Sequence, residues 1–303
     1  MMGSETRSRA VATIGAFDGV HLGHRALLQH VVQRARALDA ASWCVTFDPH
    51  PDVVMRPQRR HTYLATLDDK VRLMREQGIQ HVKVFEFTRQ LSSVTPEEFI
   101  ALLHTECSLV ELWVGPDFAM GRGRSGTPAK MTEIGLTEGF SVAVMEPQTH
   151  EGEIVSSTRI RALLASGELI QAATLLGRPY SLTGKVESGA GRGTPLGFPT
   201  ANVRPPSDMT LPADGVYVVR VGIGVEQWPG VANLGGRPTF QDHERLIEAH
   251  IFDFSRDIRG QTVNVQFLER IRPVQAFASV DALIEQIGHD VRSARSWFTQ
   301  HPE

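Results

Sequence analysis

Cysteine is scarce in this 303-residue sequence, which contains Cys44 and Cys107, each inside an apolar run. Two isolated cysteines argue against a disulfide framework and against a zinc site built on cysteines. Positive charge is not in excess either, because 31 Lys and Arg residues stand against 34 Asp and Glu residues, for a net charge of -3. A dedicated nucleic-acid-binding protein would normally carry a basic excess, so that class of function is disfavoured.

Long apolar runs are also missing. No stretch of about 18 uninterrupted apolar residues occurs, so we expect no membrane span and no membrane partner. The polar residues 1–9 lack the apolar core of a signal peptide, and we therefore expect a cytoplasmic protein. With 303 residues, of which 41% are hydrophobic, the chain can build two domains of roughly 100–200 residues each.

Strand-like and helix-like segments alternate through the first half of the sequence. We expect helices from Leu22, over 70–77, and after Thr95, which is followed by Pro96 and by Glu98 in capping-box position. The expected strands cover residues 10–14, 43–47, 82–87, 109–114 and 140–145. This alternation predicts an α/β domain with a doubly wound parallel sheet, in which ligands bind at the carboxyl ends of the strands.

The second half of the sequence has a different pattern, in which short apolar runs are separated by Gly- and Pro-rich turns. The runs are residues 216–221, 230–234, 246–252 and 263–267. They predict a small antiparallel β-barrel. A C-terminal helix should follow Ser279, its expected N-cap. The apolar face of that helix is expected to contain Val280, Leu283, Ile284, Ile287 and Val291. We place the domain boundary at residue 178, giving domains 1–178 and 179–303.

A glycine-rich turn between the first strand and the first helix is the most informative segment, running from Thr13 to His24. Backbone N–H groups and the positive end of a helix dipole make such a turn a natural phosphate site. His21 and His24 are three residues apart, share a helix face, and can donate hydrogen bonds to phosphate oxygens. The alternative, in which one histidine caps the helix and the other packs, is the weaker interpretation for this pair.

Three further segments carry polar residues where ligand-binding loops belong. Ser156, Ser157, Thr158, Arg159 and Arg161 provide more hydroxyl and guanidinium groups than helix capping needs, and they suit a triphosphate. Taken alone, that segment still favours simple capping. The loops containing Asp48 and His50, and Asp117 and Phe118, each follow a strand and are weak signals in isolation.

Together these segments resemble the N-terminal domain of the prokaryotic bifunctional riboflavin kinase/FMN adenylyltransferase (FAD synthetase) family, a member of the H-x-G-H nucleotidyltransferase superfamily. The resemblance implies a Rossmann-like fold and catalysis by His21 and His24. It also implies an ATP site formed by Gly15, Phe17, Asp18, His21, His24, Ser156, Ser157, Thr158 and Arg161. The FMN site would contain Asp48, His50, Asp117 and Phe118. In this family the FMN phosphate attacks the α-phosphorus of ATP, and no covalent enzyme intermediate forms.

The barrel half carries a glycine cluster at Gly189, Gly191 and Gly193, followed by the run Gly197-Phe198-Pro199-Thr200-Ala201-Asn202. A flexible linker is the alternative for the cluster. Because strand-like sequence precedes it and the run follows directly, we interpret the glycines as allowing close approach of the backbone to a ligand.

The run from Gly197 to Asn202 resembles the signature of riboflavin kinases. The resemblance implies that the glycine cluster and Gly197 bind ATP or flavin, and that Thr200 and Asn202 hold Mg²⁺ and the ATP phosphates. Oxygen ligands suit that cation. Glu248 would be the catalytic base, although strand alternation alone would make it a solvent-facing residue.

The sequence therefore predicts an enzyme that converts riboflavin to FMN and FMN to FAD, with ATP as co-substrate at each step. A divergent paralogue with one active half or a modified flavin substrate, and a catalytically dead flavin-binding protein, remain as alternatives. Riboflavin, FMN and ATP are the expected small-molecule partners, and the sequence leaves the oligomeric state open.

Overall fold

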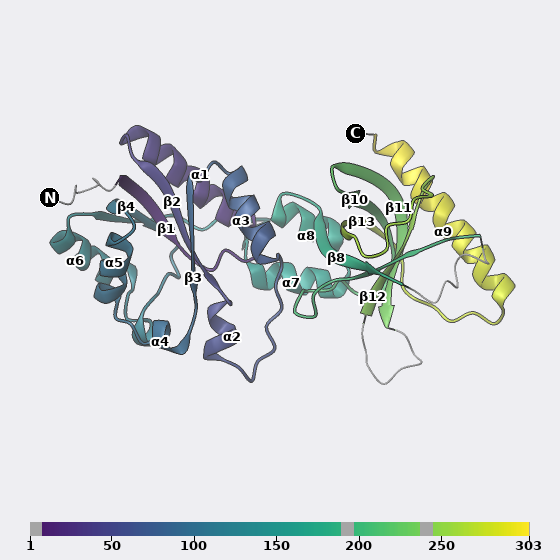
Figure 1. Cartoon of the computed structure of the whole chain (residues 1–303), viewed down its shortest axis with the longest axis horizontal. Helices are drawn as coiled ribbons and strands as arrows, with labels where there is room; N and C mark the ends of the chain where they lie inside the picture. Colours follow the sequence, from purple (N-terminus) through teal and green to yellow (C-terminus); the bar gives the residue numbers. More distant parts are fainter. Residues whose placement is uncertain (1–7, 189–196, 237–244, 303) are drawn as a thin grey trace. The chain divides into compact units, whose positions relative to one another are not determined.

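The structure is a computed structural model of the chain, and it describes residues 8–188, 197–236 and 245–302 (Figure 1). It divides into two compact units, residues 1–157 and 158–303. None of the helices in the described ranges combines the length and apolar character needed to cross a lipid bilayer.

The first unit is built on a five-stranded parallel sheet with the strand order β3-β2-β1-β4-β5. Its strands are β1 (Arg9–Ile14), β2 (Ala41–Asp48), β3 (His81–Glu86), β4 (Ser108–Val114) and β5 (Ser141–Val144). Its main helices are α1 (Leu22–Ala37), α3 (Leu67–Glu76), α5 (Pro96–His104) and α6 (Pro128–Glu138). The predicted doubly wound α/β domain is confirmed, because the strand order reverses direction at β1.

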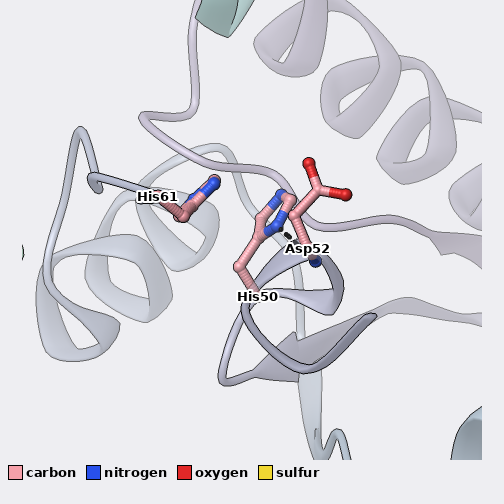
Figure 2. A group of neighbouring side chains, drawn as sticks. All are labelled: His50, Asp52 and His61. Carbon is pink, nitrogen blue, oxygen red and sulfur yellow. Dashed lines mark hydrogen bonds between the residues drawn. The ribbon is translucent and has the colours of Figure 1, made fainter. Parts of the chain in front are cut away.

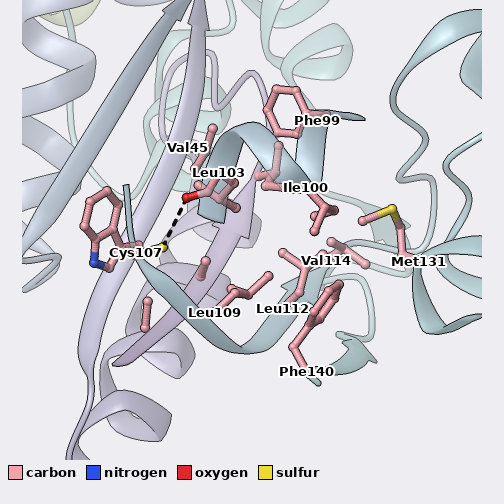
Figure 3. Packing of buried hydrophobic residues seen from close by; sticks show 14 of the residues in the cluster. Val45, Phe99, Ile100, Leu103, Cys107, Leu109, Leu112, Val114, Met131 and Phe140 are labelled. Carbon is pink, nitrogen blue, oxygen red and sulfur yellow. Dashed lines mark hydrogen bonds between the residues drawn. The ribbon is translucent and has the colours of Figure 1, made fainter. Parts of the chain in front are cut away.

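Helices cover both faces of this sheet, as Figure 1 shows. On one face, α1 and α3 bury residues such as Leu28 and Met74 against Val11 of β1. On the other face, α5 and α6 pack against β1, β2 and β4, and Figure 3 shows Phe99, Ile100 and Leu103 of α5 in that cluster. Because alternate residues of each strand enter opposite cores, the sheet is buried on both sides, which is typical of parallel sheets.

The helix starts follow the local sequence closely. Thr95 accepts a hydrogen bond from the Glu98 N–H, and the Glu98 carboxylate accepts one from the Thr95 N–H, so the predicted capping box is present. The helix expected over 70–77 begins earlier, at Leu67, because Thr66 caps it. The short elements α2 (Pro51–Met55), α4 (Arg89–Ser92), η1 (Arg122–Arg124), β6 (Thr149–His150) and β7 (Glu153–Ile154) were not expected.

The second unit contains a closed antiparallel barrel with the strand order β10-β11-β12-β9-β8-β13, which confirms the predicted barrel. Its strands are β8 (Tyr180–Glu187), β9 (Ala201–Arg204), β10 (Gly215–Ile223), β11 (Glu226–Gly236), β12 (Arg245–Ile251) and β13 (Thr262–Arg272). The barrel closes because β13 pairs with both β8 and β10. Val203, Val219, Ile247 and Val265 are fully buried.

The C-terminal helix α9 (Val280–Gln300) begins after Ser279, whose hydroxyl accepts a hydrogen bond from the Ala282 N–H. The helix packs on the outside of the barrel, where Ala294 joins a buried cluster with Val218 of β10. A buried ion pair between Arg272 and Asp290 adds to this attachment. Val280 was placed on the apolar face, but it is 61% exposed, because the first turn of α9 extends beyond the cluster.

Two helices join the sheet and the barrel in sequence, α7 (Ser157–Ser166) and α8 (Leu169–Leu176). Residues 158–176 belong to the second unit by their contacts, and α8 contacts β8 and β13. The boundary at residue 178 stays a prediction. Helices α7 and α8 lie between the last strand of the first unit and the first barrel strand in sequence, so the position of the boundary depends on the unit to which these helices belong.

Candidate active sites

The glycine-rich turn begins where β1 ends, and the Gly15 N–H donates a hydrogen bond to the Val45 carbonyl at 3.0 Å. The chain then takes positive φ angles at Phe17 (51°), Gly19 (77°) and Val20 (41°). Glycine adopts this conformation readily, but phenylalanine and the β-branched valine do so at a cost in energy. Strained backbone of this kind is concentrated at functional sites, because the surrounding structure must hold it in place.

The two histidines of the turn lie face to face. His21 is the N-cap of α1, and its Nδ1 accepts a hydrogen bond of 3.4 Å from the His24 N–H. The ring centroids are 3.6 Å apart, and the edge of the Phe17 ring contacts His24 with a centroid distance of 5.1 Å. Because Nδ1 of His21 is an acceptor, its neutral ring carries the proton on Nε2, which is then a donor.

The electrostatic surroundings of His24 keep it neutral. Burial, together with the neighbouring His21 and Lys70, lowers the pKa of His24 well below its usual range. Its Nδ1 is buried and has no hydrogen-bond partner in the part of the chain that the structure describes. A neutral ring with a buried nitrogen that has no partner among the described residues can donate a hydrogen bond to a ligand or accept one from it.

Asp18 joins the turn to two other segments. Its Oδ1 accepts a hydrogen bond of 2.9 Å from the Leu64 N–H, and its carbonyl oxygen accepts one of 2.9 Å from the Ser157 hydroxyl. Asp18 is 4% exposed. The structure thus places Ser157 beside the glycine turn, with Ser156 before it in sequence and Thr158 and Arg161 following in α7. The roles of these four residues stay predictions.

The loop after β2 approaches the same region. The His50 N–H donates to the Tyr63 hydroxyl at 3.0 Å, and Tyr63 precedes Leu64, which binds Asp18. His50 also caps α2, with its Nδ1 accepting from the Asp52 N–H at 3.1 Å. Asp48, the last residue of β2, lies two residues before His50. The loop containing Asp48 and His50 is therefore connected to the glycine turn through Tyr63 and Leu64, and its predicted contact with FMN stays a prediction.

His50, Asp52 and His61 form a cluster in which one possible ligand atom from each residue lies within 4.8 Å of the others (Figure 2). Two features oppose a shared metal ion. The imidazole rings stack with centroids 4.1 Å apart and an angle of 19°, so their in-plane lone pairs run side by side instead of converging. In addition, Asp52 pairs with Arg56 at 3.5 Å. We assign no metal to this cluster.

The loop after β4 places Asp117 and Phe118 differently. Asp117 is exposed, and its carbonyl oxygen accepts a hydrogen bond of 3.3 Å from Arg124. Phe118 is partly buried against the core on the α5 face of the sheet. The contact of Asp117 and Phe118 with FMN stays a prediction.

Sequence reasoning missed two residues beneath the glycine turn. Thr46, which is fully buried, donates a hydrogen bond of 3.1 Å to the Ala16 carbonyl. Lys70 of α3 is 7% exposed, and its ammonium donates to the Phe47 carbonyl at 2.9 Å. The sequence did contain a signal for the burial of Lys70. Leu73 and Met74 follow it by three and four residues, so all three side chains lie on the same face of α3.

In the barrel, strand register builds a row of polar residues. Asn202 of β9 pairs with Glu187 of β8 on one side and with Glu248 of β12 on the other. Glu248 in turn pairs with Asn233 of β11. Residues directly opposite one another in antiparallel strands project from the same face, so these four side chains form one band. Ile247 and Ala249, the neighbours of Glu248 in β12, are fully buried, and they project from the opposite face of the strand.

The loop before β9 brings in the other predicted kinase residues. Gly197 has a φ of 84°, a conformation that glycine adopts without strain, and Thr200 is exposed directly before β9. His250 of β12 binds the Pro199 carbonyl at 2.8 Å and contacts the Phe198 ring edge-on. Gly189, Gly191 and Gly193 lie outside the described residues.

Comparison with known proteins gives two family matches. The FAD synthetase family matches residues 3–159, and the riboflavin kinase family matches residues 176–298. The curated proteins from Escherichia coli strain K12 and Bacillus subtilis strain 168 are both named bifunctional riboflavin kinase/FMN adenylyltransferase. The first is 37% identical over 95% of this chain and 92% of its own length. The second is 31% identical over 97% and 94%, respectively.

A solved structure supports the fold over the whole chain. The crystal structure of a Streptococcus pneumoniae protein, described as a macrolide-efflux protein, matches with a TM-score of 0.88 and 31% identity. It covers 97% of this chain and 96% of that chain.

Proposed function

Because this chain belongs to the family of bifunctional riboflavin kinases/FMN adenylyltransferases, we propose an assignment of its two reactions to the two sites described above. The chain is an enzyme that phosphorylates riboflavin to FMN and then converts FMN to FAD, consuming one ATP in each reaction. The assignment rests on one observation. The histidine pair falls within the FAD synthetase match and the Asn202–Glu248 pair within the riboflavin kinase match.

In the adenylyltransferase site, an oxygen of the FMN phosphate attacks the α-phosphorus of ATP, and the bond to the β-phosphate breaks to release pyrophosphate. His21 and His24 donate hydrogen bonds to the phosphate oxygens, where negative charge develops during transfer. The turn from Gly15 to Asp18 holds ATP, as do the hydroxyl and guanidinium groups of Ser156, Ser157, Thr158 and Arg161. The loops containing Asp48, His50, Asp117 and Phe118 face the flavin.

In the kinase site, Glu248 accepts the proton of the riboflavin 5′-hydroxyl as that oxygen attacks the γ-phosphorus of ATP, and the bond from the γ-phosphorus to the bridging oxygen breaks to release ADP. Thr200 and Asn202 hold the ATP phosphates. The hydroxyl oxygen of Thr200 and the amide oxygen of Asn202 are hard-oxygen donors of the kind that Mg²⁺ prefers. Bound there, Mg²⁺ would neutralise charge on the phosphates.

We place the enzyme in the cytoplasm. Cys44 and Cys107 are both buried as free thiols in the first unit, which suits a reducing compartment. ATP is its co-substrate in both reactions.

A pair of reciprocal variants tests the assignment. His24→Ala should slow FAD formation from FMN by about 10²-fold or more, the effect of losing one transition-state donor, and leave riboflavin phosphorylation unchanged. Glu248→Gln should lower riboflavin phosphorylation by about 10²–10⁴-fold and spare FAD formation from supplied FMN. Each reaction is followed by chromatographic separation of riboflavin, FMN and FAD. Comparable losses of both activities in either variant would contradict separate sites.

A further inference from the structure

Lys70 is a buried cation that no step of the mechanism above uses. Its side chain lies on the buried face of α3, which also carries the apolar residues Leu73 and Met74, and it is 7% exposed. Burying an ammonium group is unfavourable unless it is paired and hydrogen-bonded, and an apolar side chain would fill the same position at lower cost. The charge therefore needs an explanation beyond packing.

The Lys70 ammonium donates hydrogen bonds to two backbone carbonyls near the glycine turn. Its Nζ donates to the Phe47 carbonyl at 2.9 Å and to the Ala16 carbonyl at 3.4 Å. The Ala16 carbonyl also accepts from the Thr46 hydroxyl at 3.1 Å. Two donors from different elements thus fix this one carbonyl, which belongs to the strained segment of the glycine turn.

Fixing the Ala16 carbonyl also fixes the next N–H group. In a planar trans peptide the carbonyl of one residue and the N–H of the next point in opposite directions. With the Ala16 oxygen held toward β2 and α3, the Phe17 N–H must point away from them. The hydrogen bonds of the described turn do not use this N–H. An N–H group presented in this way, next to the N-terminus of α1, is a donor for a phosphate oxygen.

The same ammonium acts on the histidine pair through its charge. Burial lowers the pKa of Lys70, and Asp48 and Asp18 oppose this effect and favour its charged form, as does Cys44 to a smaller extent. The ammonium in turn contributes to the lowered pKa of His24, after burial and His21. The titratable groups facing Lys70 therefore come from β2 (Cys44, Asp48), the glycine turn (Asp18) and α1 (His24).

We propose that Lys70 is a positioning residue for adenylyl transfer, whose ammonium fixes the Ala16 carbonyl so that the Phe17 N–H is presented to the ATP phosphates beside His24. The proposal rests on the proposed location of adenylyl transfer at the glycine turn. Lys70 itself remains beneath the turn and does not touch the substrate.

Full-length Lys70→Met and Lys70→Arg test this role, with Lys130→Met as a matched control. Lys130 is a partly exposed lysine of α6 whose ammonium pairs with Glu97 at 3.1 Å. FAD formation from FMN is measured with ATP varied, across a range of pH. Thermal unfolding reports how much of the first unit is folded, and riboflavin phosphorylation in the same samples reports that the second unit is intact.

Lys70→Met should lower kcat/KM for ATP in FAD formation by about 10–100-fold, less than the loss of a direct donor, which costs about 10²–10³-fold. Lys70→Arg should restore part of the activity, because it keeps a charged donor. The pH limb that reports His24 should move to higher pH in Lys70→Met, because removing a nearby positive charge raises the pKa of a histidine. Lys130→Met should behave as wild type.

Two results would overturn the proposal. One is unchanged kcat, KM and pH profile in Lys70→Met. The other is a loss of activity that matches a loss of folded protein, with the pH limb in place and no recovery in Lys70→Arg, which would mean that Lys70 only supports the fold. His24→Ala separates this failure from failure of the site. If that variant loses FAD formation and Lys70→Met does not, the site stands and the role of Lys70 falls; if neither loses it, the site itself falls.

Discussion

The two candidate sites are built in different ways. In the first unit, turns bring the functional residues together, and Asp18 and Ser157 are 139 positions apart in sequence when they form their hydrogen bond. Positive φ angles at Phe17 and Val20 must be held by neighbouring groups. In the barrel, the register of β9 and β12 places Asn202 opposite Glu248, and a ladder of backbone hydrogen bonds maintains that register. A turn-built site thus depends on particular side chains, whereas a register-built site depends on the sheet as a whole.

The largest expected effect comes from cutting the chain, which tests whether the register-built site is independent. A fragment of residues 158–303 keeps the second unit intact and should fold and phosphorylate riboflavin. A fragment of residues 179–303 lacks α8, which contacts β8 and β13 and buries Leu169, Leu175 and Leu176. Each buried leucine stabilises by about 1.5–3 kcal/mol, so this shorter fragment should be several kcal/mol less stable.

Circular dichroism melting and riboflavin kinase assays of both fragments measure this difference. A folded fragment 158–303 without kinase activity would break the comparison, because the barrel site would then depend on the first unit. Equal melting of the two fragments would show that α7 and α8 contribute nothing to the barrel, in agreement with a domain boundary at residue 178.

The same contrast explains what could be predicted from the sequence. The main strands and helices followed from periodicity and capping residues such as Thr95 and Ser279, because these signals are local. The resemblance to riboflavin kinases pointed to Asn202 and Glu248 separately, but their pairing depends on the register of β9 and β12, which the sequence did not reveal. Lys70 was missed because a lysine in a helix usually faces solvent, and its burial follows from tertiary packing. The strain at Phe17 has no local signal, since phenylalanine rarely adopts positive φ.

The second prediction concerns a side-chain contact that supports the barrel from outside. Asp290 of α9 is 4% exposed and accepts hydrogen bonds of 2.7 and 2.9 Å from Arg272 of β13. Asp290→Ala leaves the Arg272 charge without its partner and should lower the free energy of unfolding of the second unit by about 3–5 kcal/mol. The kinase kcat at a temperature where the variant is folded should change little, because register continues to place Asn202 and Glu248.

Chemical denaturation and kinase kinetics check this prediction, with Asp253→Ala as the control. Asp253 pairs at 3.0 Å with Arg295, which belongs to α9 like Asp290. The Asp253 side chain is 75% exposed, so in Asp253→Ala water solvates the Arg295 guanidinium and the free energy of unfolding should hardly change. A large fall in kcat in folded Asp290→Ala would mean that α9 shapes the site directly and that register alone does not.

The smallest expected effects come from two conservative substitutions of buried residues, Thr46→Val beneath the glycine turn and Ile247→Val next to Glu248 in the barrel. Thr46→Val keeps the shape of a fully buried side chain and removes its hydrogen bond to Ala16, which should cost about 0.5–1.5 kcal/mol of stability. Ile247→Val removes one buried methylene next to Glu248 and should cost a similar amount, about 0.5–1.5 kcal/mol. The two variants are therefore matched in stability but differ in what they support.

In Thr46→Val the Ala16 carbonyl retains the longer hydrogen bond from Lys70, so FAD formation should fall a few-fold while riboflavin phosphorylation stays constant. In Ile247→Val the backbone pairing of Glu248 with Asn202 is unchanged, so the kinase kcat and KM for riboflavin should match wild type. Denaturation curves and both activities, measured on the same samples, decide the matter: a kinase loss in Ile247→Val larger than the loss of FAD formation in Thr46→Val would reverse the comparison, since the barrel site would then be the one that depends on individual side chains.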